Sequence, residues 1–314
     1  MEFQHISVLL SEAVDSLHIR PDGIYVDGTA GGAGHSLAIA KQLKNGRLIA
    51  LDRDPDAVAV ATERLSGYPA VVVQSNFCDM ARVLFELHIE KVDGILLDLG
   101  VSSYQLDEAD RGFSYHKEAP LDMRMSKTGM SAADLINTAP VEEIYRILRD
   151  YGEEKFSYRI ADRIGKARSV APIKTTTRLA EIIAEAVPAA ARRDGHPARK
   201  SFQAIRIAVN GELDALSLAL DQAFSCLGVG GILSIITFHS LEDRMVKQKY
   251  KQWCTGCICP KDLPVCVCHR TPRGELLFKK AVEPSETELA NNPRSRSAKL
   301  RSIVKLKEEE NGVE

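Results

Sequence analysis

Short runs of β-branched residues alternate with amphipathic stretches through the first third of the chain. The apolar runs predict strands, and a helical spacing of apolar residues predicts helices between them. The strands are expected at Ile24–Val26, Arg47–Leu51, Ala70–Gln74 and Val92–Leu97, and the helices near His35–Leu43, Asp56–Leu65 and Met80–Leu87. Connections of this length exclude simple hairpins. The pattern therefore predicts a parallel sheet with helices on both faces and ligands at the carboxyl ends of its strands.

The strand pattern stops near Asp107 and resumes only after residue 200. Helical patterns occupy the interval at Val141–Tyr151, Ser157–Arg168 and Thr177–Val187. A helix over Ser201–Leu227 and a strand at Ile232–Phe238 then restore the α/β order, and 275–280 with 300–305 could form a terminal hairpin before a frayed tail at 308–314. We therefore expect an α/β domain made of residues 1–106 and 201–314, interrupted by an all-helical domain at 107–200.

Composition places the chain among ordinary globular proteins. Of its 314 residues, 45% are hydrophobic and 27% are charged, which excludes collagen-like, low-complexity and wholly disordered classes. No apolar run is long enough to cross a membrane, and the first residues do not resemble a signal peptide, so a cytoplasmic protein without a membrane partner is expected.

Charge is distributed unevenly along the chain. The net charge is −2, but residues 1–106 carry 8 basic and 14 acidic residues, a balance of −6, whereas residues 155–200 carry 11 and 4, a balance of +7. A basic loop, from Arg192 to Lys200, ends the second segment and includes Arg193 and Arg199. This asymmetry predicts that the helical domain contacts phosphates, the alternative being a solvated helix face.

A glycine-rich turn follows the first predicted strand. The segment Asp27-Gly28-Thr29-Ala30-Gly31-Gly32-Ala33-Gly34 suits a nucleotide-containing ligand or a plain tight turn. Its glycine spacing departs from the dinucleotide pattern, which favours a methyl donor over a nicotinamide. Asp52 ends the second strand, 25 residues after Asp27, where a carboxylate can bind ribose hydroxyls or, alternatively, cap the helix that begins at Asp54-Pro55.

Polar residues also follow the fourth and fifth predicted strands. Asp98, Ser102, Ser103 and Gln105 come at the end of the fourth, and they suit either a ligand site or a polar loop with a capping Asp. His239 ends the fifth strand, where it is either a ligand contact or a structural histidine.

Five of the seven cysteines crowd into one segment near the C-terminus. Cys254, Cys257, Cys259, Cys266 and Cys268 have paired spacings that suit a small zinc site. The alternatives are a reduced surface loop and an iron–sulfur cluster. Crowding of this kind is not typical of a disulfide framework and indicates a reducing compartment.

Seven motifs together identify a family resemblance that covers almost the whole chain. They are Asp27-Gly28-Thr29, Gly34-His35-Ser36, Asp52-Arg53-Asp54-Pro55, Leu97-Asp98-Leu99-Gly100-Val101-Ser102-Ser103, Leu121-Asp122-Met123-Arg124-Met125, Ser201-Phe202-Gln203-Ala204-Ile205-Arg206 and Phe238-His239-Ser240-Leu241-Glu242-Asp243-Arg244. In this order they resemble the bacterial small-subunit ribosomal RNA cytosine-N4 methyltransferases, subfamily H.

The resemblance implies a class I, Rossmann-like methyltransferase sheet with an inserted helical substrate-recognition domain. It also implies transfer of a methyl group from S-adenosylmethionine to N4 of a cytidine in the decoding region of 16S ribosomal RNA, within the ribosomal subunit. The family's donor contacts correspond to Ala33, Gly34, His35, Asp52, Phe77, Asp98 and Gln105. Ala33 is a departure, because glycine is expected there, and it matters if the residue needs a positive φ.

Asp98, Ser102 and His239 are the candidates for catalytic contact with the cytosine. Two other functions fit parts of the sequence: a dinucleotide-dependent oxidoreductase, and an RNA-binding or assembly factor with an inactive donor site. The glycine spacing argues against the first, and the presence of Asp27, Gly34, Asp52 and Asp98 argues against the second.

Overall fold

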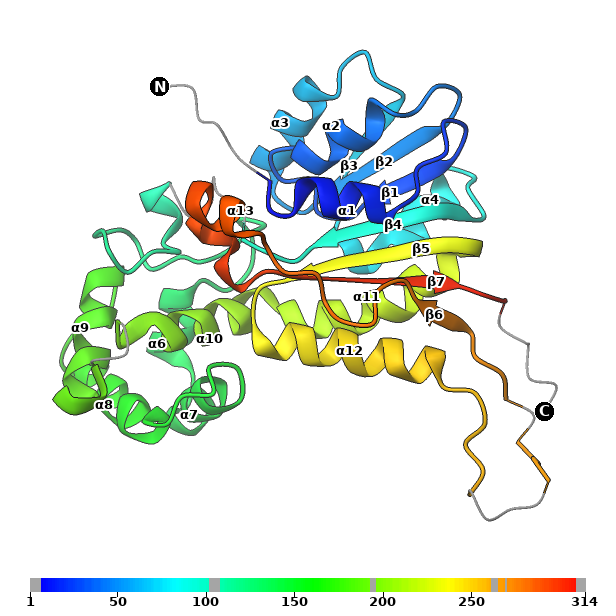
Figure 1. Ribbon diagram of the computed structural model, residues 1–314. Helices are drawn as coiled ribbons and strands as arrows, with labels where there is room; N and C mark the ends of the chain where they lie inside the picture. Colours follow the sequence, from blue (N-terminus) through cyan, green and yellow to red (C-terminus); the bar gives the residue numbers. More distant parts are fainter. Residues whose placement is uncertain (1–6, 102–107, 193–195, 261–264, 269, 309–314) are drawn as a thin grey trace. The chain divides into compact units, whose positions relative to one another are not determined.

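A seven-stranded sheet organises the larger part of the chain, in a computed structural model that describes residues 7–101, 108–192, 196–260, 265–268 and 270–308 (Figure 1). The strand order is β3-β2-β1-β4-β5-β7-β6. The first five strands are parallel, whereas β7 runs antiparallel to both β5 and β6. The strands are β1 (Ile24–Asp27), β2 (Arg47–Asp52), β3 (Ala70–Gln74), β4 (Val92–Asp98), β5 (Leu227–Thr237), β6 (Gly274–Leu276) and β7 (Lys299–Lys305).

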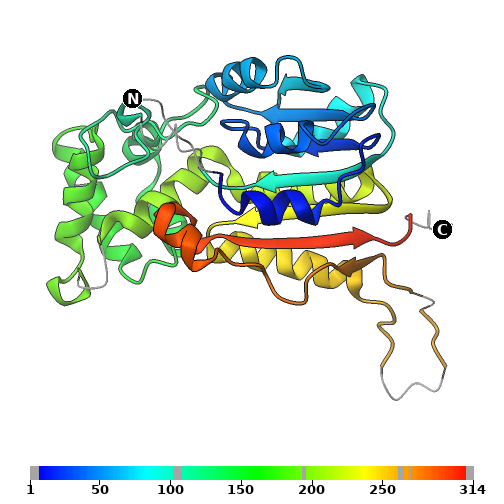
Figure 2. The same cartoon turned by 45° about the horizontal axis from the view of Figure 1, so that its top comes forward.

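Helices cover both faces of this sheet, as Figures 1 and 2 show. Helices α1 (Leu10–Ser16), α2 (Gly34–Ala40) and α3 (Pro55–Arg64) pack on one face, and α4 (Met80–Glu86), α11 (Glu212–Cys226) and α12 (Ser240–Cys254) on the other. Successive side chains of β2 point to opposite faces of the sheet. Leu48 and Ala50 belong to the core between the sheet and α1–α3, the first core cluster, while Ile49 and Leu51 belong to the second core cluster, on the face covered by α4, α11 and α12. The predicted α/β class with a doubly covered sheet is therefore confirmed.

The chain divides into two compact units, one of residues 1–100 and 214–314 and the other of residues 101–213. The second unit is helical. Its helices are α6 (Ala132–Thr138), α7 (Val141–Asp150), α8 (Ser157–Val170), α9 (Thr176–Ala186) and α10 (Ala198–Asn210), with short 3-10 turns at Ala109–Arg111 and Ala189–Arg192. Its own core includes Leu148, Ile160, Ile164, Leu179, Ile183 and Ile205.

The helix predicted over Ser201–Leu227 is wrong, because two helices occupy this stretch. Gly211 ends α10 in the left-handed conformation, with φ of 57°, and α11 begins at the next residue. Phe202 and Ile205 of α10 pack in the core of the helical unit, whereas Leu216 and Leu220 of α11 pack against the sheet. The sheet unit therefore resumes about a dozen residues later than the sequence pattern indicates.

The C-terminal hairpin pairs β6 with β7 as expected, and β7 also adds to the sheet beside β5. A short helix, α13 (Glu286–Asn291), and a 3-10 turn at Pro293–Ser297 precede β7. The predicted fraying does not begin at Glu308, whose carboxylate accepts hydrogen bonds from Lys305 Nζ at 2.8 Å and Lys91 Nζ at 3.1 Å; residues 309–314 lie outside the described part. Among the described residues, no helix has the length and apolar composition needed to cross a membrane.

Candidate functional site

The glycine turn is held by the carboxylate of Asp27, which is buried at the end of β1. This carboxylate accepts hydrogen bonds from Ser36 Oγ at 2.6 Å and from the main-chain N–H of Thr29 at 3.1 Å. The hydroxyl oxygen of Thr29 in turn accepts from the main-chain N–H of Asp98 at 2.6 Å. The turn and the end of β4 are therefore joined, so the side chains at both strand ends keep a fixed relative position.

At two glycines of this turn, neighbouring residues lie too close for a side chain to fit. A Cβ on Gly34 would lie 1.8 Å from Ser7 Oγ, and one on Gly28 would lie 2.4 Å from the Leu97 side chain. The same Cβ on Gly28 would lie 3.0 Å from Cβ of Phe77, which begins the 3-10 turn after β3 (Phe77–Asp79). Phe77 therefore lies beside the turn.

Ala33 adopts the left-handed conformation, with φ of 58° and ψ of 28°, immediately before α2. Its methyl group is fully buried among the residues of the first core cluster. The left-handed region disfavours any residue with a Cβ, by about 1–2 kcal/mol. Ala33 therefore stands at a position that requires a positive φ, where glycine would be favoured, and its side chain strains the backbone there.

Asp52 ends β2 with both carboxylate oxygens turned to main-chain donors. Oδ2 accepts from the N–H of Gly31 at 2.7 Å, and Oδ1 from the N–H of Asp54 at 2.8 Å. Desolvation by burial raises the pKa of this carboxyl above its ordinary value. The cap of α3 is Asp54, whose side chain accepts from the N–H of Asp56 at 3.1 Å, so the capping alternative considered for Asp52 belongs to its neighbour.

Asp98 ends β4 beside His35. His35 Nδ1 lies 3.7 Å from Asp98 Oδ2, and the side chains are 6% and 23% exposed, respectively. The other oxygen, Oδ1, is buried and has no hydrogen-bond partner among the described residues. Burial raises the pKa of Asp98 to about 6, an effect that the nearby His35 opposes and that the carboxylates of Asp27 and Glu242 reinforce.

His239 lies at the carboxyl end of β5, as the sequence predicts, and it is also the N-cap of α12. Its Nδ1 accepts from the N–H of Glu242 at 3.4 Å, while the Glu242 carboxylate accepts from the N–H groups of Phe238 and His239. Nε2 lies 3.0 Å from Glu242 Oε1 but makes no hydrogen bond to a described residue. Both side chains are buried, so the local geometry gives His239 a structural task whether or not it contacts a ligand.

Two of the predicted contacts, Ser102 and Gln105, lie outside the described residues, as do Ser103 and Arg193. The structure brings the remaining predicted residues of the sheet unit to the ends of β1, β2, β3, β4 and β5. These residues are Ala33, Gly34, His35, Asp52, Phe77, Asp98 and His239.

Four of the five cysteines in the segment 254–268 form one group. The thiols of Cys257, Cys259, Cys266 and Cys268 all lie within 4.8 Å of one another. Cys254 stands outside this group, at the end of α12, where burial raises its thiol pKa. The expected five-residue ligand set is therefore reduced to four.

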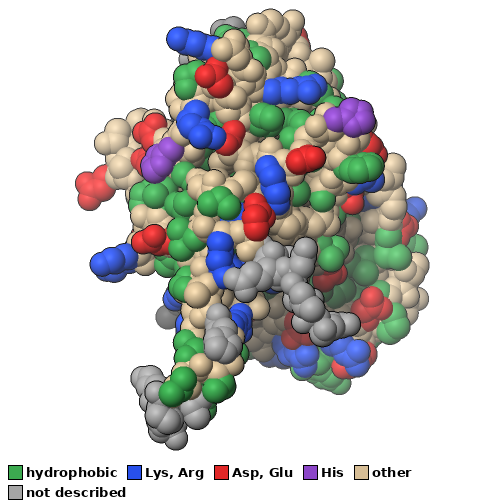
Figure 3. All heavy atoms as spheres, turned by 90° about the vertical axis from the view of Figure 1, so that its right-hand side faces the viewer, with side chains coloured by type: hydrophobic (Ala, Val, Ile, Leu, Met, Phe, Trp, Pro, Cys, Tyr) green, Lys and Arg blue, Asp and Glu red, His purple; other side chains and the backbone are tan. Residues whose placement is uncertain are grey.

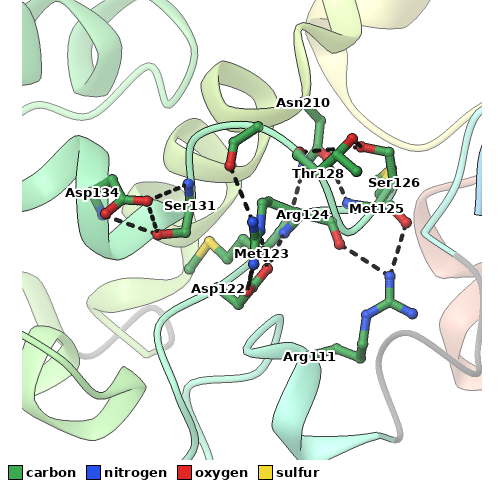
Figure 4. A network of polar contacts seen from close by, with 11 residues as sticks. Arg111, Asp122, Met123, Arg124, Met125, Ser126, Thr128, Ser131, Asp134 and Asn210 are labelled. Atoms are coloured by element: carbon green, nitrogen blue, oxygen red, sulfur yellow. Dashed lines mark hydrogen bonds and ion pairs between the residues drawn. The ribbon is translucent and has the colours of Figure 1, made fainter.

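The motif at Leu121–Met125 forms a closed polar network in the helical unit, which Figure 4 shows. Arg124 forms a two-pronged ion pair with Asp122, and Arg111 donates to the carbonyls of Arg124 and Met125. Desolvation opposes ionisation of Asp122, but Arg124 outweighs it and lowers the Asp122 pKa. Asn210 then binds the N–H of Met125 and the carbonyl of Met123, so this motif holds a loop against α10.

The motif at 238–244 contributes another ion pair, which lies in the sheet unit. Arg301 of β7 binds the carboxylate of Asp243 through Nε at 2.7 Å and through its terminal nitrogen at 3.2 Å. Together with the Glu242 cap, this pair fixes the start of α12 and hence His239.

Comparison with known proteins shows what these motifs mean. The model of the MraW methylase family matches residues 2–306. The chain belongs to this family. A relative from Clostridium botulinum (strain Kyoto / Type A2), named ribosomal RNA small subunit methyltransferase H, is 53% identical over 309 residues, which are 98% of this chain and all of that protein. Relatives of the same name from Lachnospira eligens and Symbiobacterium thermophilum are 53% and 52% identical, and the alignments cover 98% of this chain and 99% and 98% of theirs.

The predicted family resemblance is thereby confirmed, and family membership makes methyl transfer the chemistry to be explained. Among solved structures, an rRNA methylase from Streptococcus thermophilus aligns with a TM-score of 0.43 and 11% identity over 96% of this chain and 99% of that one. The family's donor, S-adenosylmethionine, can be tested for fit against the residues present. The buried Oδ1 of Asp98 accepts no hydrogen bond from a described residue, so the residues present would fit a ligand ammonium or amine group at this position.

Sequence reasoning missed the residues that support the site from behind. Thr29 contacts Asp98, Ser36 contacts Asp27 behind the glycine turn, and Glu242 contacts His239, yet the sequence pattern marks none of the three as a site residue. The available signal was spacing: Glu242 stands three residues after His239, the separation of a capping box.

Proposed function

We propose that the protein transfers a methyl group from S-adenosylmethionine to the exocyclic N4 of a cytidine in the decoding region of 16S ribosomal RNA, within the small ribosomal subunit. Family membership and the relatives' names support methylation of small-subunit ribosomal RNA. The observation that carries the proposal is the buried Oδ1 of Asp98 at the end of β4, which has no hydrogen-bond partner within the described part of the chain.

The donor would be held by residues of the turn and of the strand ends. S-adenosylmethionine supplies an activated methyl group on a sulfonium, so no covalent enzyme intermediate is needed. Asp52 retains lone pairs beyond its two main-chain bonds and would accept from the ribose hydroxyls, with Phe77 beside the adenine. Ala33, Gly34, His35, Asp98 and Gln105 complete the proposed set of donor contacts.

The acceptor requires orientation more than activation. The lone pair of cytosine N4 is delocalised into the ring, which makes this nitrogen a poor nucleophile. A protein group that accepts a hydrogen bond from N4–H favours a more pyramidal and more nucleophilic nitrogen. Asp98, Ser102 and His239 are the proposed contacts of this amine. No general base is assigned, because the methylated ammonium can release its proton to water.

The helical unit would bind the RNA. Three of the acids at 155–192 already pair with basic neighbours: Asp162 with Lys166, Glu181 with Arg178 and Glu185 with Arg163. Among the described residues, the exposed cations Lys155, Arg159, Lys174 and Arg199 have no acidic partner. These four side chains, with Arg192 and Lys200, provide the charge expected to contact phosphates.

The deciding experiment gives the protein methyl-labelled S-adenosylmethionine with either deproteinised 16S RNA or small subunits that lack the modification. Digestion to nucleosides should release label as N4-methylcytidine, with small subunits the better substrate. Label in another nucleoside would refute the N4 assignment, and a preference for naked RNA would refute the ribosomal context. Donor binding without transfer to either substrate would favour the assembly-factor alternative. A spectral shift on adding a nicotinamide cofactor would favour the oxidoreductase.

A further inference from the structure

The four-cysteine group projects from the sheet unit on an arm between α12 and β6, drawn in gold and orange in Figure 1. The Sγ–Sγ distances are 3.4 Å for Cys257–Cys266, 4.0 Å for Cys259–Cys266, and 3.7 Å for both Cys266–Cys268 and Cys257–Cys268. These separations are well beyond a disulfide bond of about 2.05 Å, and the cysteines are free thiols.

The separations match those around a single tetrahedral metal ion. Zinc–thiolate bonds are about 2.3 Å long, so four sulfurs at the corners of a tetrahedron around Zn²⁺ lie about 3.8 Å apart. A multi-iron cluster distributes its thiolates over two or more irons and therefore needs a wider arrangement. The geometry accordingly favours one ion over a cluster.

The described residues of the arm contribute no apolar core of their own. From Cys254 to Arg273 no described residue is buried, and Ile258, Val265 and Val267 are 59%, 70% and 68% exposed. Figure 3 shows hydrophobic side chains at the surface of this arm beside the residues drawn in grey. Since the described residues of the arm bury no apolar side chain, their burial cannot offset the entropy of ordering the backbone, and convergence of the four thiols calls for a cross-link.

A main-chain contact also fits a metal-bound thiolate. The N–H of Ile258 donates to Sγ of Cys268 at 3.5 Å, joining one pair of cysteines to the other. Hydrogen bonds of this kind orient metal-bound ligands. The base of the arm is fixed separately, where the N–H of Arg273 donates to the carbonyl of Trp253 at 2.8 Å and the Trp253 ring stacks on Phe224.

We infer that Cys257, Cys259, Cys266 and Cys268 bind one structural Zn²⁺ ion as four thiolates. All four coordination positions are filled by protein sulfur, so the ion stabilises the arm and leaves no position for a substrate or water. The site lies outside the proposed methyl-transfer residues, and this inference does not depend on the proposed function.

The test is the metal content of the full chain purified under reducing conditions without chelator. Elemental analysis should find about one zinc per chain. The double variant Cys257→Ser/Cys266→Ser should lose that zinc, while the matched variant Cys254→Ser, in the same segment but outside the group, should retain it. Replacement of zinc by Co²⁺ should give the thiolate charge-transfer and visible bands of a tetrahedral sulfur site. Protease cleavage within 255–272 should accelerate in the double variant.

Three results would overturn the inference. They are a reduced, metal-free chain that does not take up Zn²⁺ or Co²⁺, equal zinc content in the two variants, and iron in place of zinc. Affinity for S-adenosylmethionine, measured in parallel, should be the same in both variants, so failure of the zinc site is distinguishable from failure of the methyltransferase proposal.

Discussion

His35 Nδ1 faces Asp98 Oδ2 at 3.7 Å, while Nε2 of the same ring lies 3.0 Å from the carbonyl of Val8. A carbonyl only accepts, so Nε2 carries a proton, and Nδ1 presents a lone pair to Asp98 unless the ring is charged. A lone pair on Nδ1 and a lone pair on the carboxylate would repel each other, so the contact is favourable only when a proton lies between these two atoms. Protonation at the end of β4 should influence ligand binding.

The first prediction concerns pH. Since the Asp98 pKa is raised to about 6, its carboxylate is largely protonated below that pH and cannot bind a cationic or N–H donor well. Affinity for S-adenosylmethionine should therefore rise with pH through about 6 and level off above it. Calorimetry across this range tests the prediction. In His35→Gln the midpoint should move upward, because the electrostatic contribution of His35 that lowers the Asp98 pKa is lost; a flat profile in both proteins would contradict the role of Asp98.

The contribution of Asp98 to the free energy of unfolding should fall as pH rises, whereas its contribution to donor affinity should rise. A carboxyl whose pKa rises from 3.8 to about 6 on folding stabilises the folded protein below about pH 4, and this contribution is lost as pH rises through about 6. The difference corresponds to about 3 kcal/mol. Asp98→Asn should therefore be more stable than the parent at neutral pH, and this advantage should vanish near pH 4. Chemical denaturation at the two pH values measures it, and equal stability at neutral pH would argue against a buried charge.

Asp52 provides a test of the ribose assignment. Asp52→Ala removes two charge-assisted hydrogen bonds to the ribose, each worth about 1.5–3 kcal/mol, so donor affinity should fall at least tenfold. Asp54→Ala is the matched control: it removes the cap of α3 and should lower stability by about 1 kcal/mol with little loss of affinity. Unchanged affinity in Asp52→Ala, measured by calorimetry, would exclude the ribose contact.

The strained turn gives a prediction about stability alone. Ala33→Gly relieves about 1–2 kcal/mol of left-handed strain, and the greater freedom of glycine in the unfolded chain offsets about half of it. Loss of the buried Ala33 methyl group costs about 0.8 kcal/mol more, the value for one buried CH₂, so the net change in the free energy of unfolding should be close to zero in chemical denaturation. Ala30→Gly, in the same turn but without a positive φ, should instead destabilise the protein. A loss of stability in both variants would mean that Ala33 is not strained.

The sequence predicts the first four strands to within about one residue at each end, because buried parallel strands are continuous β-branched runs with little competing pattern. The fifth strand begins at Leu227, well before the predicted start at Ile232, because it continues through glycines that the sequence pattern assigns to a turn. It does not locate the break at Gly211, since apolar residues continue at helical spacing on both sides of that glycine. The strand ends carrying Asp52 and Asp98 follow from topology. The links from Ser36 to Asp27 and from Thr29 to Asp98 do not, because spacing along the chain does not determine which way a side chain points.

The last prediction concerns the cations of the helical unit. If Lys155, Arg159, Lys174 and Arg199 contact RNA phosphates, replacing all four by Gln should weaken RNA binding and flatten its dependence on salt, because fewer counterions are released. Donor affinity should not change, since these residues lie outside the sheet unit. The measurements are RNA binding across a salt series and the methylation rate at subsaturating small subunits.

A matched control removes the same kind of charge where it is already neutralised locally. Arg163, Lys166 and Arg178 each pair with an acid on the surface of the helical unit, in contacts of 2.6–3.0 Å. Replacing these three by Gln should change stability little, because exposed ion pairs contribute about 0–1 kcal/mol each, and it should affect the salt dependence less than the fourfold variant does. If the two variants weaken binding equally per charge removed, the effect is one of net charge alone. If neither does, the helical unit is not the part of the protein that holds the RNA.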